Sequence, residues 1–253
     1  MKYVGRTDIG IKRKSNQDSF AIFAKGDYMC AIVCDGMGGA KGGNIASGLA
    51  VKTFSSVIKK AFSSRNADNY TEEQVKALLS DAVNAANAAI HARALRDDEL
   101  DGMGTTLVAC ISCLCGTFAV NVGDSRLYKI TEGSIKQVST DHSFVQYLLD
   151  HGEITRQQAE HHPNKNIILR ALGVNESVEC DLFRIDAFDM LLLCTDGLTN
   201  HLTDDRILEI VTNSDYVGTR PPSAKARVEA LIKEANHNGG SDNITAVIVI
   251  NEQ

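Results

Sequence analysis

Four aspartates stand where runs of apolar residues stop or start, and their placement is the first sign of chemistry in this chain. They are Asp35 after residues 29–34, Asp124 after residues 118–123, Asp196 after residues 190–195, and Asp242 before residues 244–250. A carboxylate at the edge of a buried strand is costly unless something pairs with it. Three of the four have no basic residue beside them, and only Asp124 has one nearby, Arg126.

If these carboxylates converge, they repel one another and raise each other's pKa. A pair of divalent cations removes that conflict, and oxygen ligands suit Mg²⁺ or Mn²⁺. Gly36 follows Asp35 and allows close approach of the backbone, so its carbonyl could be a further ligand. A single Asp-Gly pair is typical of a turn, but four strand-end aspartates in one chain favour a shared metal site.

Arg13 could supply the second part of a phosphate site. It lies five residues before Asp18 and beside a predicted strand, and a guanidinium can bind a phosphate through two hydrogen bonds. The basic run 12–14 on its own indicates no more than a solvated surface. Other chemistries lack their motifs: the glycine-rich stretch 36–43 has no Gly-Lys-Ser/Thr ending, and Gly-x-Ser-x-Gly and His-Glu-x-x-His are absent.

Composition limits the function classes further. The chain has 253 residues, 26 basic against 32 acidic side chains, and a formal charge of −6, which argues against binding nucleic acid through phosphate neutralisation. The 43% apolar and 23% charged content is that of a globular protein. The one long uncharged stretch, 102–123, is interrupted by polar residues and glycines, so we expect no membrane span. Residues 1–20 have no apolar core of a signal peptide.

The seven cysteines lie mostly in strand-like runs. An odd number, with no signal peptide, favours reduced thiols in a cytoplasmic protein. Cys110 and Cys113 have the spacing of a metal or redox pair, but on a strand they point to opposite faces. We therefore expect them to be structural.

The pattern of elements favours an α+β fold with antiparallel sheets, because strands come in runs and helices in pairs. The expected strands are 3–8, 19–24, 28–34, 105–115, 117–122, 126–130, 135–138, 180–185, 190–195 and 244–250. The expected helices are 44–61, 71–90, 204–212 and 223–236. Thr71 and Gln74 have the spacing of a capping box at the start of the second helix. One domain, 1–253, covers the chain.

Eight motifs in order, between residues 6 and 250, carry a family resemblance. They are Arg13-x-x-Asn16-Gln17-Asp18, Asp35-Gly36-Met37-Gly38-Gly39, Gly102-Met103-Gly104-Thr105-Thr106, Val122-Gly123-Asp124-Ser125-Arg126, Asp141-His142-Ser143, Ile168-Leu169-Arg170-Ala171-Leu172-Gly173, Thr195-Asp196-Gly197-Leu198 and Ser241-Asp242-Asn243-Ile244-Thr245. The chain resembles the metal-dependent 2C-type protein serine/threonine phosphatases in their compact bacterial form.

The resemblance implies a four-layer α-β-β-α sandwich of two antiparallel sheets flanked by helix pairs. It also implies a centre of two Mn²⁺ or Mg²⁺ ions and a set of residue roles. Asp35, the Gly36 carbonyl, Asp196 and Asp242 would be metal ligands, Asp18 would hold metal-bound water, Arg13 would bind the phosphate, and Asp124 with Asp196 would form a third metal site. Residues 140–165 would be a flap beside the active site, where His142 is a candidate residue.

The implied reaction is direct hydrolysis of phosphoserine and phosphothreonine in proteins by a metal-bridging hydroxide. Met37 replaces a histidine proposed as general acid in eukaryotic relatives, and Asn200 stands where some relatives carry another metal-binding aspartate. The resemblance implies phosphoprotein substrates and a cognate serine/threonine kinase, and we expect a monomer.

Two alternatives remain open. One is a catalytically dead member that binds phosphoproteins, although the intact Asp35, Asp196 and Asp242 disfavour it. The other is a two-metal enzyme that acts on a different phosphoester, such as a nucleotide. The acidic charge and the missing nucleotide loop disfavour the second.

Overall fold

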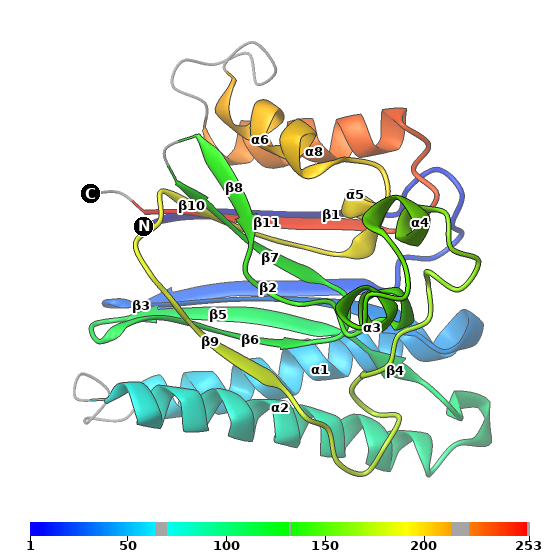
Figure 1. The fold of residues 1–253 in the computed structure, drawn as a ribbon. Coiled ribbons are helices and arrows are strands. Elements are labelled where there is room, and N and C mark those ends of the chain that lie inside the picture. The colour runs from blue at the N-terminus through cyan, green and yellow to red at the C-terminus, as the bar shows by residue number, and fades with distance from the viewer. Residues whose placement is uncertain (64–69, 132, 214–222, 252–253) are drawn as a thin grey trace.

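Two antiparallel β-sheets lie face to face at the centre of the computed structural model (Figure 1). The structure describes residues 1–63, 70–131, 133–213 and 223–251. The strands are β1 (Lys2–Asp8), β2 (Asp18–Lys25), β3 (Tyr28–Met37), β4 (Gly104–Thr105), β5 (Leu107–Cys113), β6 (Gly116–Val122), β7 (Arg126–Thr131), β8 (Ser134–Gln137), β9 (Asp181–Ile185), β10 (Met190–Cys194) and β11 (Ile244–Ile250).

One sheet has the strand order β1-β11-β10-β7-β8, and the other has the order β2-β3-β5-β6-β9 with β4 paired to β3. Each described pairing is antiparallel. The chain starts and ends in the same sheet, because β1 pairs with β11 from Lys2 opposite Ile250 to Asp8 opposite Ile244. The register therefore carries the N-terminal loop that follows Asp8 to the start of β11, where Asp242 lies.

Strand β3 shows why its apolar run has no polar gaps. Met29, Ala31 and Val33 point into the core between the sheets, whereas Cys30, Ile32 and Cys34 point into the core beneath the helices. Successive strand residues face opposite sides, so a strand covered on both faces needs apolar residues at every position. Such a strand can bury its whole length only if helices cover the outer face of its sheet.

Helices cover both outer faces. They are α1 (Gly39–Phe62) and α2 (Glu72–Ala94) on the six-stranded sheet, α6 (Asp204–Thr212) and α8 (Ala224–His237) on the five-stranded sheet, and the short η2 (Asp98–Leu100), α3 (Phe144–Asp150), α4 (Arg156–Glu160) and α5 (Asp196–Thr199) in connections. Thr71 caps α2, and its hydroxyl and the Gln74 side chain form the predicted capping box. The predicted α-β-β-α sandwich is confirmed.

Three of the differences from the elements predicted from sequence lie near the aspartates. The predicted strand 105–115 is divided into β4 and β5, because Thr106 leaves the ladder to bond to Asp35. Helix α1 begins at Gly39 rather than at residue 44. Asp196 starts a one-turn helix, α5, where the sequence indicated only a turn.

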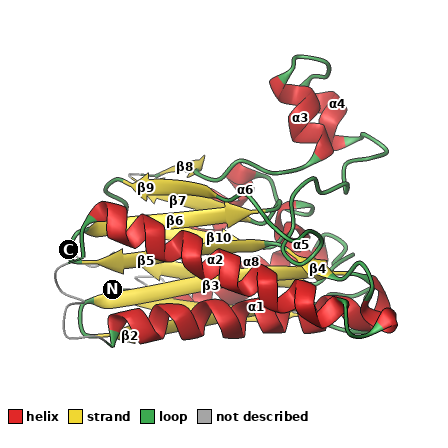
Figure 2. Ribbon diagram, turned by 90° about the horizontal axis from the view of Figure 1, so that it is seen from below, coloured by secondary structure: helices red, strands yellow, loops and turns green. Residues whose placement is uncertain are grey.

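The predicted flap is a helical hairpin. Figure 2 shows α3 and α4 projecting away from the sandwich. Among the described helices, none has both the length and the apolar content that crossing a membrane requires.

Candidate metal centre

Five aspartates from both sheets lie at one end of the sandwich, where their charges interact. Asp18 begins β2 opposite Asp35 of β3, Asp124 follows β6, Asp196 follows β10, and Asp242 precedes β11. The pKa of Asp35 is raised well above its ordinary value by burial first, and then by the charges of the other four. The structure therefore brings together Asp18 and the four strand-end aspartates.

Asp18 is held by two threonines from the opposite sheet. Its Oδ2 accepts hydrogen bonds from Thr195 Oγ1 at 2.9 Å and Thr245 Oγ1 at 2.7 Å. Its Oδ1 is buried and has no described partner. Burial raises the pKa of Asp18 to about 7, and the two threonine hydroxyls lower it in part. One oxygen is therefore fixed by the fold, and the other is free to accept.

Two threonines also fix the backbone of Asp35. The Asp35 N–H donates to Thr106 Oγ1 at 2.9 Å, and the Asp35 carbonyl accepts from Thr106 N at 2.9 Å and from Thr105 Oγ1 at 2.8 Å. Thr106 Oγ1 in turn lies 2.7 Å from Ser125 Oγ, beside Asp124. These bonds join the two segments that carry Asp35 and Asp124 while leaving both carboxylates out of the scaffold.

Close backbone packing explains the glycine that follows Asp35. A Cβ at Gly36 would lie 2.0 Å from the carbonyl oxygen of Gly43, and a Cβ at Gly43 would lie 2.6 Å from the carbonyl oxygen of Gly36. Any side chain at either position would separate the start of α1 from the end of β3. The glycine-rich stretch therefore packs α1 directly onto the strand end that carries Asp35.

Asp196 and Asp124 each have a buried Oδ1 without a described partner. Burial and the Asp242 charge raise the pKa of Asp196, whereas hydrogen bonds with Asp35 and Asn200 lower it. The Asn200 amide donates to Asp196 Oδ2 at 3.0 Å. Burial and the charge of Asp196 raise the pKa of Asp124 to about 8. These oxygens are desolvated acceptors that lack a donor.

Arg13 forms an ion pair with the cluster. Its Nη2 donates to Asp242 Oδ2 at 2.6 Å, and the Arg13 side chain is 49% exposed. The hydrogen bond to Asp242 raises the pKa of Arg13, and the charges of Asp35 and Asp196 act in the same direction. The guanidinium therefore lies at the mouth of the cluster, where it faces both the carboxylates and solvent.

Asn243 positions the loop that carries Arg13, a role that the sequence did not reveal. Its Oδ1 accepts from Gln17 N at 2.8 Å, and its Nδ2 donates to the carbonyls of Ile9 and Ser15 at 2.9 and 3.0 Å. The neighbouring Asp242 and the loop are thereby fixed to each other. The two motifs were visible in the sequence, but their contact spans more than 200 residues.

The donor set fits divalent cations by chemistry and charge. The carboxylates supply hard oxygen ligands, and several of their oxygens have no described partner. Burial first, and the charges of neighbouring carboxylates after it, raise their pKa values. Over the described ranges, no three His, Cys, Asp or Glu side chains surround a single point as ligands of one ion. Asp242 is instead held by Arg13, so a cation would compete with this guanidinium.

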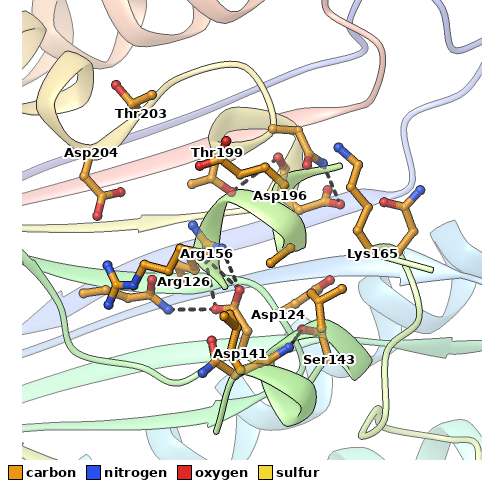
Figure 3. Close-up of a pocket in the computed structure, with 18 of the residues that line it drawn as sticks. Asp124, Arg126, Asp141, Ser143, Arg156, Lys165, Asp196, Thr199, Thr203 and Asp204 are labelled. Atoms are coloured by element: carbon orange, nitrogen blue, oxygen red, sulfur yellow. Dashed lines mark hydrogen bonds and ion pairs between the residues drawn. The ribbon is translucent and has the colours of Figure 1, made fainter. Parts of the chain in front are cut away.

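A cleft of about 1040 Å³ opens beside Asp124 and Asp196, between the flap on one side and α5 with the start of α6 on the other (Figure 3). Arg126 lies in it but does not pair with Asp124, its neighbour in sequence. It donates to both oxygens of Asp141, at 2.7 to 3.0 Å. The nearest base in the sequence therefore leaves Asp124 unpaired.

His142 lies at the base of the flap and is buried. Its Nδ1 accepts from Gly123 N at 3.0 Å, which places the proton on Nε2, and Nε2 lies 3.1 Å from Asp181 Oδ2. His142 N also donates to the Gly123 carbonyl at 3.0 Å. The side chain therefore joins the flap to the segment before Asp124 and to β9.

Comparison with known proteins shows which family the chain resembles in sequence. A sequence model of the family described as protein phosphatase 2C matches residues 10–232. The chain is 40% identical over 247 residues to the serine/threonine phosphatase stp of Listeria welshimeri, covering 96% of this chain and 93% of that protein.

Two solved structures are similar as well. Serine/threonine phosphatase Stp1 from Staphylococcus aureus superposes with a TM-score of 0.88 and 31% identity over 100% of this chain and 95% of that one. The catalytic domain of the phosphatase PstP, solved in complex with two manganese ions, superposes with a TM-score of 0.79 and 33% identity over 98% and 96%.

Proposed function

Because the chain belongs to the protein phosphatase 2C family, we propose that it is a metal-dependent phosphatase that hydrolyses phosphoserine and phosphothreonine in proteins. The observation that carries this proposal is the cluster of buried carboxylates whose free oxygens have no described donor. The cluster holds more negative charge than the fold neutralises. The catalytically dead alternative gains no support, because Asp35, Asp196 and Asp242 are all present in the sequence.

Asp35, the Gly36 carbonyl, Asp196 and Asp242 would hold two Mn²⁺ or Mg²⁺ ions, and Asp124 with Asp196 would hold a third. When bound, such ions neutralise the carboxylates, polarise phosphoryl oxygens and lower the pKa of water. The Asn200 amide already occupies Asp196 Oδ2. The third position would therefore rely on the free oxygens of Asp124 and Asp196.

The side chains of this chain have separate tasks around that centre. Asp18 Oδ1 would accept a hydrogen bond from the attacking water, because the two threonines occupy Oδ2 and fix the carboxylate orientation. Arg13 would move from Asp242 to the substrate phosphoryl group, because its guanidinium is half-exposed and can bind the anionic oxygens of either group. Catalysis then depends mainly on positioning and on neutralising charge.

The cleft beside Asp124 and Asp196 would receive the protein segment around the phosphorylated residue. It runs along the flap and α5, so the substrate chain would contact residues outside the carboxylate cluster. We propose in addition that the protein works as a monomer in the cytoplasm opposite a serine/threonine kinase. Seven free cysteines are compatible with a reducing compartment.

The test is hydrolysis of a phosphothreonine peptide by the purified protein with Mn²⁺, with EDTA, and in Asp196→Asn. Phosphate release should require Mn²⁺ and should be abolished in the variant. Asp27→Asn, an exposed change in a turn, is the matched control and should keep full activity. Turnover that survives EDTA would contradict metal dependence, whereas metal binding without turnover would favour the phosphoprotein-binding alternative.

A further inference from the structure

Two cysteines meet at the turn between β5 and β6. Cys113 is the last residue of β5 and pairs with Gly116, the first residue of β6, so Leu114 and Cys115 form the turn. The Sγ atoms of Cys113 and Cys115 lie 3.3 Å apart. The sequence spacing had drawn attention to Cys110 and Cys113, whereas the structure pairs Cys113 with Cys115.

This pair is more accessible to solvent than four of the other five cysteines, and the fifth, Cys180, is also half-buried. Four cysteines, Cys30, Cys34, Cys110 and Cys194, are buried. Cys113 and Cys115 are half-buried, and Leu114 between them is 62% exposed. Small oxidants in solution can therefore reach the turn.

We propose that Cys113 and Cys115 form a dithiol that closes to an intramolecular disulfide when it meets hydrogen peroxide. A disulfide needs its sulfur atoms about 2.0 Å apart, so the two Sγ atoms have to approach by little more than one ångström. Leu114 and Cys115 lie outside the strand ladder, where side-chain rotation costs less than inside a sheet.

The order of attack follows from the hydrogen bonds. Cys113 Sγ donates to the Gly116 carbonyl at 3.4 Å, which holds Cys113 in its protonated form. Burial first, and the adjacent Cys115 sulfur second, raise the pKa of Cys113 to about 12. Because the Gly116 carbonyl holds the Cys113 thiol, Cys115 is the thiol that attacks first, and Cys113 is the one that resolves.

Oxidation of the pair proceeds in two steps. In the first, the Cys115 thiolate attacks one peroxide oxygen, an S–O bond forms as the O–O bond breaks, and the leaving hydroxide takes a proton to become water. Cys113 Sγ then attacks Cys115 Sγ, an S–S bond forms as the S–O bond breaks, and the second hydroxide leaves with the Cys113 proton as water. Two thiols lose two electrons in total, and one peroxide gains them.

The turn lies far from the carboxylate cluster. Strand β5 separates Cys113 from Thr106 by seven residues, which is roughly 20 Å of extended chain. Figure 1 shows the β5–β6 turn at the end of the sheet opposite to α5. We therefore expect closure of the disulfide to leave phosphatase turnover unchanged within twofold.

The experiment treats the reduced full chain with a small excess of hydrogen peroxide and measures the intact mass. Loss of 2 Da is expected, with one peptide that contains linked Cys113 and Cys115 after digestion, and dithiothreitol should reverse it. Cys113→Ser and Cys115→Ser should each abolish the loss. Cys180→Ser, a half-buried cysteine on another segment, is the matched control and should retain it.

A sulfenic acid trap separates the two roles. In Cys113→Ser, dimedone should label Cys115, whereas in Cys115→Ser it should leave Cys113 unlabelled. Differential alkylation of the wild-type chain before and after peroxide should show that Cys113 and Cys115 lose their reactivity together, without any substitution. A wild-type mass that rises by 32 Da at Cys115, or a linkage that involves another cysteine, would overturn the proposal.

Discussion

Two groups of carboxylates line the same cleft, and the fold treats them in opposite ways. Asp141 accepts from Arg126 through both oxygens and from Gln137 Nε2 at 2.7 Å. Asp124 and Asp196 each keep a buried Oδ1 with no described donor, and the pKa of each is raised. Asp141 therefore belongs to a completed ion pair, whereas Asp124 and Asp196 carry negative charge for which the described residues supply no donor at Oδ1.

The difference between Asp141 and the cluster distinguishes a carboxylate that stabilises the fold from carboxylates that are available to bind metal. Removing one partner of a mostly buried pair leaves the other charge uncompensated and is strongly destabilising. Removing a charge that already lacks a partner relieves repulsion instead. Loss at Asp141 should therefore appear in stability, and loss in the cluster should appear in metal binding and turnover.

The largest effect is expected from Asp35→Asn. Loss of a partner that orients a metal ligand costs 10- to 100-fold, so loss of a proposed ligand should lower kcat/KM by at least about 1000-fold. Its melting temperature in EDTA should stay equal to wild type or rise, because one buried negative charge is removed. A fall in that melting temperature with activity intact would contradict this, because Asp35 would then stabilise the fold and would not be needed for turnover.

Asp141→Asn should do the opposite. Breaking its bonds with Arg126 should cost about 3 kcal/mol of unfolding free energy, which for a chain of this size lowers the melting temperature by roughly 6–12 °C. Mn²⁺ affinity should remain within a few fold of wild type. The check is thermal unfolding beside a Mn²⁺ titration, and unchanged stability would show that the pair contributes nothing.

The carboxylate cluster should also make the stability of the metal-free protein depend on pH. Folded-state pKa values of about 7 for Asp18 and about 8 for Asp124 lie above the unfolded value of about 3.9. The folded protein therefore binds more protons between these values, and the contribution of these groups to stability falls as pH rises from about 4 to about 8. Above pH 8 their contribution is constant.

Denaturant unfolding in EDTA between pH 5 and 9 measures how the free energy of unfolding changes with pH. This dependence should be weaker in Asp124→Asn. It should be weaker still when saturating Mn²⁺ replaces EDTA, because the ions displace the protons. A metal-free slope that is the same in wild type and Asp124→Asn would mean that this carboxylate does not take up a proton on folding.

A smaller effect is expected from Arg13→Ala. Loss of a charge-assisted hydrogen bond to phosphate should raise KM about tenfold. Mn²⁺ should bind as well as in wild type or slightly better, because Arg13 no longer competes for Asp242. Lys59→Ala on α1 is a control for loss of positive charge away from the site. Unchanged KM with weakened Mn²⁺ binding would remove Arg13 from the phosphate role.

Most of the fold could be predicted from the sequence, because β3 and its neighbours have continuous apolar runs and α2 begins with a capping box. The aspartates could be predicted as well, since carboxylates next to apolar strands are conspicuous. The threonines that hold these aspartates could not. Thr106, Thr195 and Thr245 look like ordinary strand residues, and their bonds to Asp35 and Asp18 span 71 to 227 positions of the chain.

A neighbour in sequence was misleading at Arg126, which stands two residues from Asp124 but pairs with Asp141. Cys110 and Cys113 face opposite sides of their strand, as the sequence predicts, because Cys110 lies in the core between the sheets and Cys113 packs against the core beneath the helices. The partner of Cys113 is Cys115 at the turn. Which group a side chain meets where a strand ends depends on the turn and on the segments that pack there, and local spacing does not determine that.

The most direct test of the central claim is a Mn²⁺ titration of the metal-free chain, with ions bound and phosphate released from a phosphothreonine peptide measured on the same sample. We predict at least two ions per chain, turnover that rises only as they bind, and neither response in Asp196→Asn. Turnover in the metal-free chain, or full turnover in Asp196→Asn, would contradict the claim that the open carboxylates are the catalytic centre.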